Sequence, residues 1–439
     1  MNLLANKDLH KKNKFFQKFI LFYFFYILLE GAFRKWFLPN LANEIIIIRD
    51  LFVIFIIMKA ITRQYYNFNS LLEKVLIYWT ILVLFWIILQ ILFTDIEIFV
   101  FIIGLRNWVL YFWFSVLIFR VFNTFDEINN FINKIIYTII PISLLVLVQH
   151  YLPIDHFLNK QIGSGIIFTV AKDIVRVTGT FSFTSGQAEY VSFITPFFLY
   201  LLLEKEKHEP FLIKIILLFS LLTCVAVSGS RGLIISTTMM VLIALIYNKN
   251  YKNFIVNLFI FLFILFICFF IYERAIEATV TRFTTAQDDI FYIRIIKSIL
   301  PNVNALDNFN LIGQGIGLGS NMSANYTDLG RNFTLGEGEH NRIISEGGLL
   351  GVVFYISKFI VSIFFIKKSL KIYKEFNIAL PLYFSIYVVI QLLLHPITGQ
   401  ITAHAFTFLS LGFLLSILNL YPSIKDNKND KKKSNTLNF

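Results

Sequence analysis

The sequence predicts an all-α, polytopic membrane protein that crosses the bilayer about twelve times and carries one large polar loop. Three observations lead to this prediction. Hydrophobic residues make up 57% of the 439 positions and charged residues only 15%, a balance outside the range of soluble domains. Apolar stretches of about 16 to 24 residues recur, and about 20 residues cross a bilayer as a helix. Finally, the formal charge of +12 is concentrated in a few short segments.

The apolar stretches define the expected spans in chain order. They lie at 15–29, 45–60, 75–93, 98–121, 135–152, 187–203, 212–227, 233–247, 254–272, 343–366, 378–394 and 403–421. The first follows "KKNKFF" and has no small-residue cleavage site behind it, so we expect a retained helix rather than a removed signal peptide. Residues 1–439 are therefore expected to form a single integral membrane domain.

Lysine-rich segments set the expected orientation. They are the N-terminus, "KKSLKIYKEF" and the basic tail at 422–439, which contains "KDNKNDKKK". The positive-inside rule places such segments in the cytoplasm, and an even number of spans returns both termini to that side. A nucleic-acid-binding tail is the alternative, and a retained cytoplasmic flank is the preferred interpretation. Cys224 and Cys268 both fall inside expected spans, so the sequence predicts neither a disulfide framework nor a thiolate metal cluster.

Arginine is distributed in the opposite way. With this topology only Arg63 and Arg120 lie on the cytoplasmic side. The others fall in outer loops or outer halves of spans: Arg34, Arg49, Arg106, Arg176, Arg231, Arg274, Arg282, Arg294, Arg331 and Arg342. Guanidinium is a planar fork that binds phosphate or carboxylate bidentately, so the outer face is expected to bind an anion. The alternative is pairing with outer acids, such as Glu30, Glu44, Asp50, Asp95 and Glu97.

Two outer segments are too long to be simple turns, at 153–186 and 273–342. The larger one begins with a pattern that predicts amphipathic helices carrying Arg282 and Arg294. It continues with "NLIGQGIGLGSN", whose alternate glycines, Gly315 and Gly317 among them, permit close backbone approach. The spacing does not match a dinucleotide fingerprint, and a flexible outer loop is the alternative interpretation. The lack of an internal repeat argues against a transporter built from inverted repeats.

The stretch "GEGEHNRIISEGGLLG" places charged groups directly before an apolar run. His340 is the candidate general base, because a neutral imidazole can accept a hydroxyl proton. Glu337 and Glu339 either orient the histidine or act as the base themselves. Asn341 is expected to cap a helix that begins at Arg342 or Ile343.

The same stretch contains an acid expected inside the apolar helix. Glu346 needs a partner there, and an outer arginine is the expected one. Arg342 is a candidate partner for either Glu339 or Glu346. Glycines 347, 348 and 351 are expected to let this helix pack close to a neighbour.

Taken together and in order, several motifs resemble one protein family. "VTGTFSFTSGQAEYVSFITPFFLY", "VSGSRGLIIS", "NLIGQGIGLGSN" and "EHNRIISEGGLLGVVFY" are similar to elements of the O-antigen ligase and polymerase superfamily of bacterial envelope proteins. "LLEGAFRKWFLP" also resembles the opening of some members. The resemblance runs from residue 22 to about residue 366.

This resemblance implies a GT-C-like glycosyltransferase of the bacterial inner membrane, with its active site on the periplasmic face and no cofactor. The implied donor is an undecaprenyl-diphosphate-linked glycan, and the implied acceptor is a glycan hydroxyl. A polymerase of lipid-linked repeat units is the leading hypothesis, with a chain-length regulator as a further expected partner. A ligase acting on lipid A core is the alternative, and a flippase for a lipid-linked anion is the alternative from another class.

The chemistry assigns roles to the arginines. Cleaving an anomeric bond to diphosphate requires stabilisation of the leaving group, and without a metal-binding DxD motif fixed arginines are the expected stabilisers. Arg231 is the first candidate, because the helix that follows "SGSRG" adds its N-terminal partial charge toward a phosphate. Arg282, Arg294 and Arg176 are further candidates for diphosphate binding. No metal site is predicted, because the histidines of "HPITGQITAH" are isolated from cysteines and acids and are expected to be interfacial.

Overall fold

The computed structural model describes the chain at residues 2–162, 169–171, 174–203, 210–247, 251–284, 299–300, 310–333 and 338–436. The predicted all-α class is confirmed, because 80% of the structure is helical with almost no strand. The strands described are β1 (Thr169–Ala171) and β2 (Ile174–Val175), which pair antiparallel. The predicted basic tail continues the last helix as far as Thr436.

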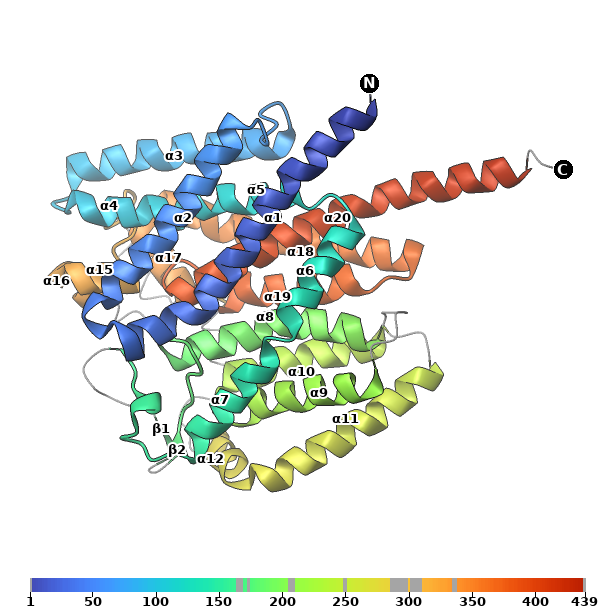
Figure 1. The fold of residues 1–439 in the computed structure, drawn as a ribbon. Helices are drawn as coiled ribbons and strands as arrows, with labels where there is room; N and C mark the ends of the chain where they lie inside the picture. The colour runs from blue at the N-terminus through green and yellow to red at the C-terminus, as the bar shows by residue number, and fades with distance from the viewer. Residues whose placement is uncertain are drawn as a thin grey trace.

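Long helices dominate the architecture (Figure 1). In chain order the helices are α1 (Asn2–Ala32), α2 (Ala42–Thr62), α3 (Leu71–Phe93), α4 (Ile98–Leu105), α5 (Tyr111–Val121), α6 (Phe125–Ile136), α7 (Ile139–Tyr151), α8 (Thr184–Leu203), α9 (Phe211–Ala226), α10 (Arg231–Ile246), α11 (Tyr251–Ile271), α12 (Glu273–Thr284), α15 (Asn321–Tyr326), α16 (Asp328–Phe333), α17 (Glu339–Gly347), α18 (Leu349–Phe376), α19 (Leu380–Leu394) and α20 (Ile401–Thr436). Shorter helical turns are η1 (Phe33–Phe37), η2 (Pro39–Leu41), η3 (Arg106–Leu110) and η4 (Phe157–Asn159).

The two ends of the bundle differ in what they carry. The beginning of α1 and the end of α20 project from the same end (Figure 1). At the opposite end lie α12, α15, α16 and the two strands, together with the beginning of α10 and the end of α19. We call this the loop end. Both of the long segments expected on one side of the membrane therefore contribute to a single end of the molecule.

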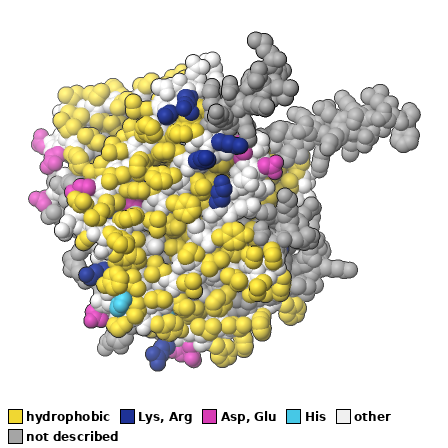
Figure 2. Space-filling view, viewed as in Figure 1, with side chains coloured by type: hydrophobic (Ala, Val, Ile, Leu, Met, Phe, Trp, Pro, Cys, Tyr) yellow, Lys and Arg dark blue, Asp and Glu magenta, His cyan; other side chains and the backbone are white. Residues whose placement is uncertain are grey.

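The surface is that of a membrane protein. Figure 2 shows hydrophobic side chains over most of the visible face, and large residues such as Leu71 and Leu92 are among those that the bundle leaves exposed. Soluble monomers rarely expose an apolar surface of this extent. Among the described residues, six helical segments are long and apolar enough to cross a membrane. They are Asn13–Phe37, Leu71–Phe93, Ile98–Val121, Phe125–Tyr151, Leu349–Phe376 and Ile401–Tyr421.

The structure thus supports a helical membrane protein but does not support twelve spans. Three of the expected spans correspond to α9, α10 and α19, which have 16, 16 and 15 residues. At about 1.5 Å per residue, helices of this length fall short of a hydrocarbon core of about 30 Å. The expected span at 45–60 lies in α2, which contains charged residues in its middle. The prediction of twelve spans considered neither the length of each helix nor the charged residues within it.

The expected span at 343–366 is also divided. The chain forms the short helix α17, breaks at Gly348 and resumes as α18. Gly348 has a φ of +55°, and the Leu349 backbone N–H donates to the Leu311 carbonyl at 2.9 Å instead of continuing the first helix. A Cβ atom on Gly348 would lie 2.3 Å from that same carbonyl oxygen. This break lets the glycine segment approach the end of α17.

We predict that Gly348→Ala destabilises the protein by about 1–3 kcal/mol, because the substitution combines a left-handed backbone with a steric clash. Chemical or thermal unfolding of the purified protein in micelles measures this. The matched control is Gly232→Ala in α10, where a Cβ would meet nothing within 4 Å; alanine there is expected to be neutral or to stabilise by up to about 1 kcal/mol. Equal losses of stability in the two variants would contradict the described break.

Candidate functional site

The glycine segment at 313–319 packs directly against α17. The backbone N–H groups of Gln314 and Gly315 donate to the carbonyls of Ser345 and Glu346 at 2.8 and 3.1 Å. Gly315 and Gly317 both have positive φ, and a Cβ on Gly317 would lie 2.4 Å from a backbone oxygen of α4. The predicted close approach of alternate glycines is confirmed, and the alternative of a flexible loop is wrong for this segment.

Glu346 holds this segment through both carboxylate oxygens. The N–H groups of Gly317 and Gly319 donate to them at 3.1 and 2.9 Å, and the Arg342 Nε lies 3.6 Å from Oε1. Burial raises the pKa of Glu346 to about 7, although Arg342 and the two N–H donors act in the opposite direction. The predicted pairing of Glu346 with an arginine is confirmed. The acid lies at the end of α17, however, and not one turn into a continuous apolar helix.

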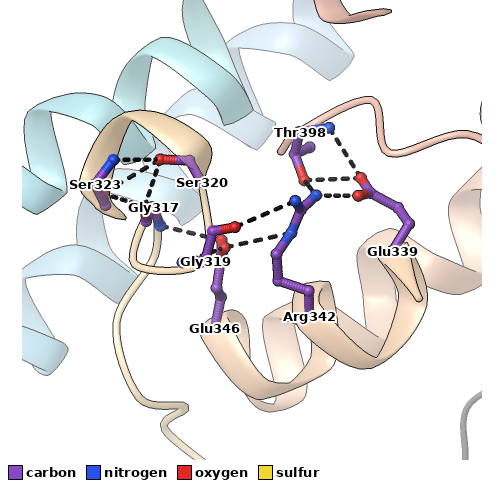
Figure 3. Close-up of polar contacts among 8 residues, drawn as sticks. All are labelled: Gly317, Gly319, Ser320, Ser323, Glu339, Arg342, Glu346 and Thr398. Carbon is purple, nitrogen blue, oxygen red and sulfur yellow. Dashed lines mark hydrogen bonds and ion pairs between the residues drawn. The ribbon is translucent and has the colours of Figure 1, made fainter. Parts of the chain in front are cut away.

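Arg342 is the centre of the polar contacts in Figure 3. Its Nη2 contacts the Glu339 carboxylate and donates to the Thr398 hydroxyl at 2.7 Å. Its Nη1 donates to the Gly319 carbonyl at 3.2 Å. A Cβ on Gly399 would overlap the guanidinium, so a larger residue at that position would displace Arg342 from its present contacts. Arg342 therefore joins α17, the glycine segment and the turn between α19 and α20.

Glu339 is engaged to a similar degree. Its Oε1 accepts hydrogen bonds from the Thr398 N–H at 2.9 Å and the Thr398 hydroxyl at 2.8 Å, while its Oε2 pairs with Arg342. Burial alone would raise the pKa of Glu339, but Arg342, Lys358 and the hydrogen bonds from Thr398 outweigh it and lower the pKa. Such a carboxylate is a weak base. Its contacts join α17 to the turn between α19 and α20.

Asn341 does not have the expected capping role. Helix α17 begins at Glu339, and Gly338, with a φ of +123°, takes the N-cap position without any side-chain hydrogen bond. Asn341 is the third residue of the helix. The capping prediction is wrong because the helix begins earlier than the apolar pattern indicated.

His340 has one ring nitrogen bound and the other without a partner. Its Nε2 lies 2.9 Å from the Leu393 carbonyl, and because a carbonyl only accepts, Nε2 carries the proton. In the described part of the chain Nδ1 has no hydrogen-bond partner. The side chains of Tyr355 and Phe359 pack against the ring, with centroids 4.8 and 6.2 Å away. Burial, followed by the charge of Lys358, lowers the pKa of His340 to about 4, so the imidazole is neutral at pH 7.

A second histidine follows α19 directly, and its pKa is shifted in the opposite direction. His395 Nδ1 lies 2.5 Å from Oε1 of Glu189 on α8. Burial opposes the charged imidazolium, but Glu189 outweighs it and raises the pKa of His395. The prediction that this histidine is isolated from acids is wrong. His404 is not interfacial either, because it is 1% exposed inside the bundle.

Arg231 lies at the loop end, as the first residue of α10. The Ser230 hydroxyl caps this helix by accepting from the Leu233 N–H at 3.4 Å. The Ser192 and Ser236 hydroxyls, 3.0 Å apart, join α10 to α8. Helix α10 also packs against α19, whose C-terminal end binds His340. These contacts bring the beginning of α10 toward the end of the bundle that holds the histidine.

The remaining candidate arginines differ in how much the structure says of them. Arg176 directly follows β2 at the loop end. Arg282 lies in α12 with its side chain outside the described residues, and Arg294 lies outside them altogether, as does Glu337. The structure therefore brings together Glu339, His340, Arg342 and Glu346 with the glycine segment, and places Arg231 and Arg176 on other elements at the same end.

Carboxylate pairing, the alternative interpretation of the outer arginines, is confirmed for three of them. Arg34 and Arg49 lie 3.5 and 3.3 Å from the two oxygens of Glu30. Arg106 pairs with Asp50 at 2.6 Å. These side chains are buried inside the bundle.

Several residues of the site could not be recognised from the sequence. Gln90 on α3 donates to the carbonyls of Ile312 and Glu346, both at 2.8 Å, and accepts from the Ile316 N–H at 2.9 Å. Thr398 is the principal partner of Glu339. It lies between the two histidines of "HPITGQITAH". This pair of histidines is the sequence feature that marks the turn. No family model, curated protein or solved structure matches the chain.

We predict that Glu346→Gln loosens the glycine segment. Glutamine keeps the volume but has one acceptor oxygen, so it cannot serve both glycine N–H groups and Arg342 together. The expected loss of stability is about 1–3 kcal/mol, measured by thermal unfolding and by faster proteolysis near residues 313–319. Glu44→Gln in the exposed first turn of α2 is the control, with an expected change within about 0.5 kcal/mol. Retained protection of the glycine segment would contradict the role of Glu346.

Proposed function

We propose that this protein is a membrane glycosyltransferase that polymerises undecaprenyl-diphosphate-linked repeat units on the periplasmic face of a bacterial inner membrane. The observation that carries the proposal is the state of His340. Its imidazole is neutral, its Nε2–H is fixed by the Leu393 carbonyl, and the lone pair of Nδ1 has no partner among the described residues. This is the state required of a general base.

In the proposed reaction the acceptor hydroxyl attacks the anomeric carbon of the donor. Its proton moves to Nδ1 of His340, and the bond between the anomeric carbon and the diphosphate oxygen breaks. The electron pair leaves with the diphosphate, whose additional charge is stabilised by Arg231 and by the N-terminus of α10. Arg176, Arg282 and Arg294 are proposed as further contacts to the diphosphate.

The low pKa of His340 fits this order of events. With no substrate bound, Lys358 and burial disfavour the imidazolium. A diphosphate bound nearby brings negative charge, which raises the pKa of an imidazole. The imidazole therefore becomes a stronger base only when the donor is present. In the empty site it stays neutral and remains able to accept a proton.

Access to His340 requires a local movement. The imidazole is 1% exposed, whereas Tyr355, which packs edge-on against it, is only partly buried. The Tyr355 hydroxyl donates to the Ile299 carbonyl at 3.0 Å, a single hydrogen bond that a sugar hydroxyl can replace. We propose that the acceptor sugar displaces this aromatic ring and stacks in its place.

A transporter is the second candidate, and one observation favours it. Lys358 lies in the spanning helix α18, is 2% exposed and has an ammonium group with no hydrogen-bond partner among the described residues. Glu189 is likewise buried and pairs with His395. Ionisable residues at such depth often mark substrate or ion pathways. A flippase of this kind needs an ion gradient or another energy source, whereas the glycosyltransferase uses the energy of its donor.

We predict that His340→Gln lowers transfer by purified protein by a factor of about 10²–10⁴, because the proton acceptor is lost. Arg231→Lys is expected to lower it by about 10²–10³, because lysine keeps the charge but not the bidentate fork. Product formation from a lipid-linked oligosaccharide, without any ion gradient, is the measurement.

His156→Gln and Arg63→Lys are the matched controls, and both should retain normal transfer. His156 caps the short turn η4, and Arg63 is exposed at the end of α2. All four variants are checked for insertion and for unfolding temperature. Normal transfer by folded His340→Gln protein removes the proposed base, and turnover that requires an ion gradient favours the transporter.

A deletion strain separates the polymerase from the ligase, which shares the same chemistry. We expect loss of the polymerase to leave lipid A core carrying a single repeat unit. Loss of a ligase would leave core with no repeat at all. Electrophoresis and mass spectrometry of the extracted glycolipid make this distinction, and complementation with His340→Gln should reproduce the deletion pattern.

A further inference from the structure

A group of five charged side chains is buried where α1, η1, α2 and η3 pack together. It consists of Glu30, Arg34, Arg49, Asp50 and Arg106, which we call the buried arginine cluster. All five are less than 9% exposed, and Arg49 is 0% exposed. Three guanidinium groups and two carboxylates leave one positive charge without compensation. Burying an uncompensated charge in a bilayer-embedded bundle is strongly unfavourable.

Most donors of the cluster have partners. Arg34 donates to the Ala42 carbonyl at 2.7 Å and to the Ser182 hydroxyl at 2.9 Å. Arg106 donates from Nε to Asp50 at 2.6 Å and from Nη1 to the Asn107 side chain at 2.6 Å. The second oxygen of Asp50 accepts from the Tyr111 hydroxyl at 2.6 Å, so this carboxylate has no oxygen free of contacts.

Arg49 is the exception. Its only hydrogen bond among the described residues is a long one, from Nη1 to Glu30 at 3.3 Å. Its Nε and Nη2, and the Nη2 of Arg106, have no acceptor within the described part of the chain. Each buried donor without a partner costs about 1–3 kcal/mol, and more when the group is charged. Arg49 interacts electrostatically with Asp50 and with Arg106, so these donors belong to one region.

The backbone around the cluster is also unusual. Arg34 lies in the π-helical turn η1, and Arg106 begins the π-helical turn η3. Such turns are rare in α-helical chains and occur frequently at functional sites. Each of the two π-helical turns contains one arginine of the cluster, although the turns are about seventy residues apart in the sequence.

We propose that the buried arginine cluster is a site for a small monovalent inorganic anion such as chloride, held by Arg49 and Arg106. One negative charge neutralises the excess positive charge and accepts from the three donors that lack a partner. A water molecule would accept hydrogen bonds but would leave the charge uncompensated. Because Arg49 is 0% exposed, a small anion is the better fit. None of the five residues of the cluster takes part in the proposed transfer reaction.

The test compares sodium chloride, sodium bromide and sodium gluconate at equal ionic strength on the purified wild-type protein in nanodiscs. We expect chloride and bromide to raise the unfolding temperature by about 2 °C or more relative to gluconate, with a saturable concentration dependence. Crystals grown in bromide should show an anomalous peak between Arg49 and Arg106. Equal stability in all three salts, with no bromide peak, overturns the proposal.

Arg49→Gln should abolish the halide dependence. The matched control is Arg120→Gln, because Arg120 is a partly buried arginine that pairs with Glu73 and Ser70 and lacks the donors without partners. Its halide dependence should equal that of the wild type. If Arg49→Gln fails to fold, the anomalous peak in the wild type decides the question alone. A halide effect that is equal in the wild type and in folded Arg49→Gln also overturns the proposal.

Discussion

The loop end of this bundle depends on one partly buried guanidinium. Arg342 contacts Glu339, Glu346, Thr398 and the Gly319 carbonyl, so a single side chain joins a short helix, a glycine segment and an interhelical turn. Burying a charge is favourable only when its hydrogen bonds are nearly all satisfied. The steric requirements at the neighbouring glycines follow from this constraint, because a side chain at Gly399 would occupy the position of the guanidinium.

This arrangement also explains why His340 is distinct from its neighbours. The carboxylates next to it are already paired, so neither is free to hold a proton on the imidazole. His395, one residue beyond α19, has Glu189 as a direct partner, and the pKa values of the two histidines are shifted in opposite directions. Environments that separate the pKa values of nearby groups are typical of acid–base sites. His340 binds the Leu393 carbonyl near the end of α19, and His395 directly follows the same helix.

What the sequence could predict depended on how local each contact is. The pairing of Arg342 with Glu346 follows from a spacing of four residues on a helix, and the alternate glycines indicated close approach wherever they packed. Thr398 and Gln90 could not be predicted, because their contacts with α17 span 59 and 256 residues of chain. The break at Gly348 was missed because hydropathy averages over a window, whereas a break depends on the φ of one residue. The count of twelve spans failed because several apolar stretches form helices too short to cross a bilayer and one helix contains charged residues in its middle.

The arginines buried in the bundle can be divided by their hydrogen bonds. Pairing with a carboxylate buried in the same bundle removes much of the cost of burying a guanidinium. Arg34 and Arg106 each pair with one carboxylate and donate to further acceptors, and some of these partners lie on distant parts of the chain. Arg49 does not, although it is the most deeply buried of the three. An arginine kept inside a membrane protein without enough acceptors is explained by structure only if something else supplies the acceptor. The unsatisfied donors of Arg49 and Arg106, rather than the number of arginines, are therefore the basis of the proposed anion site.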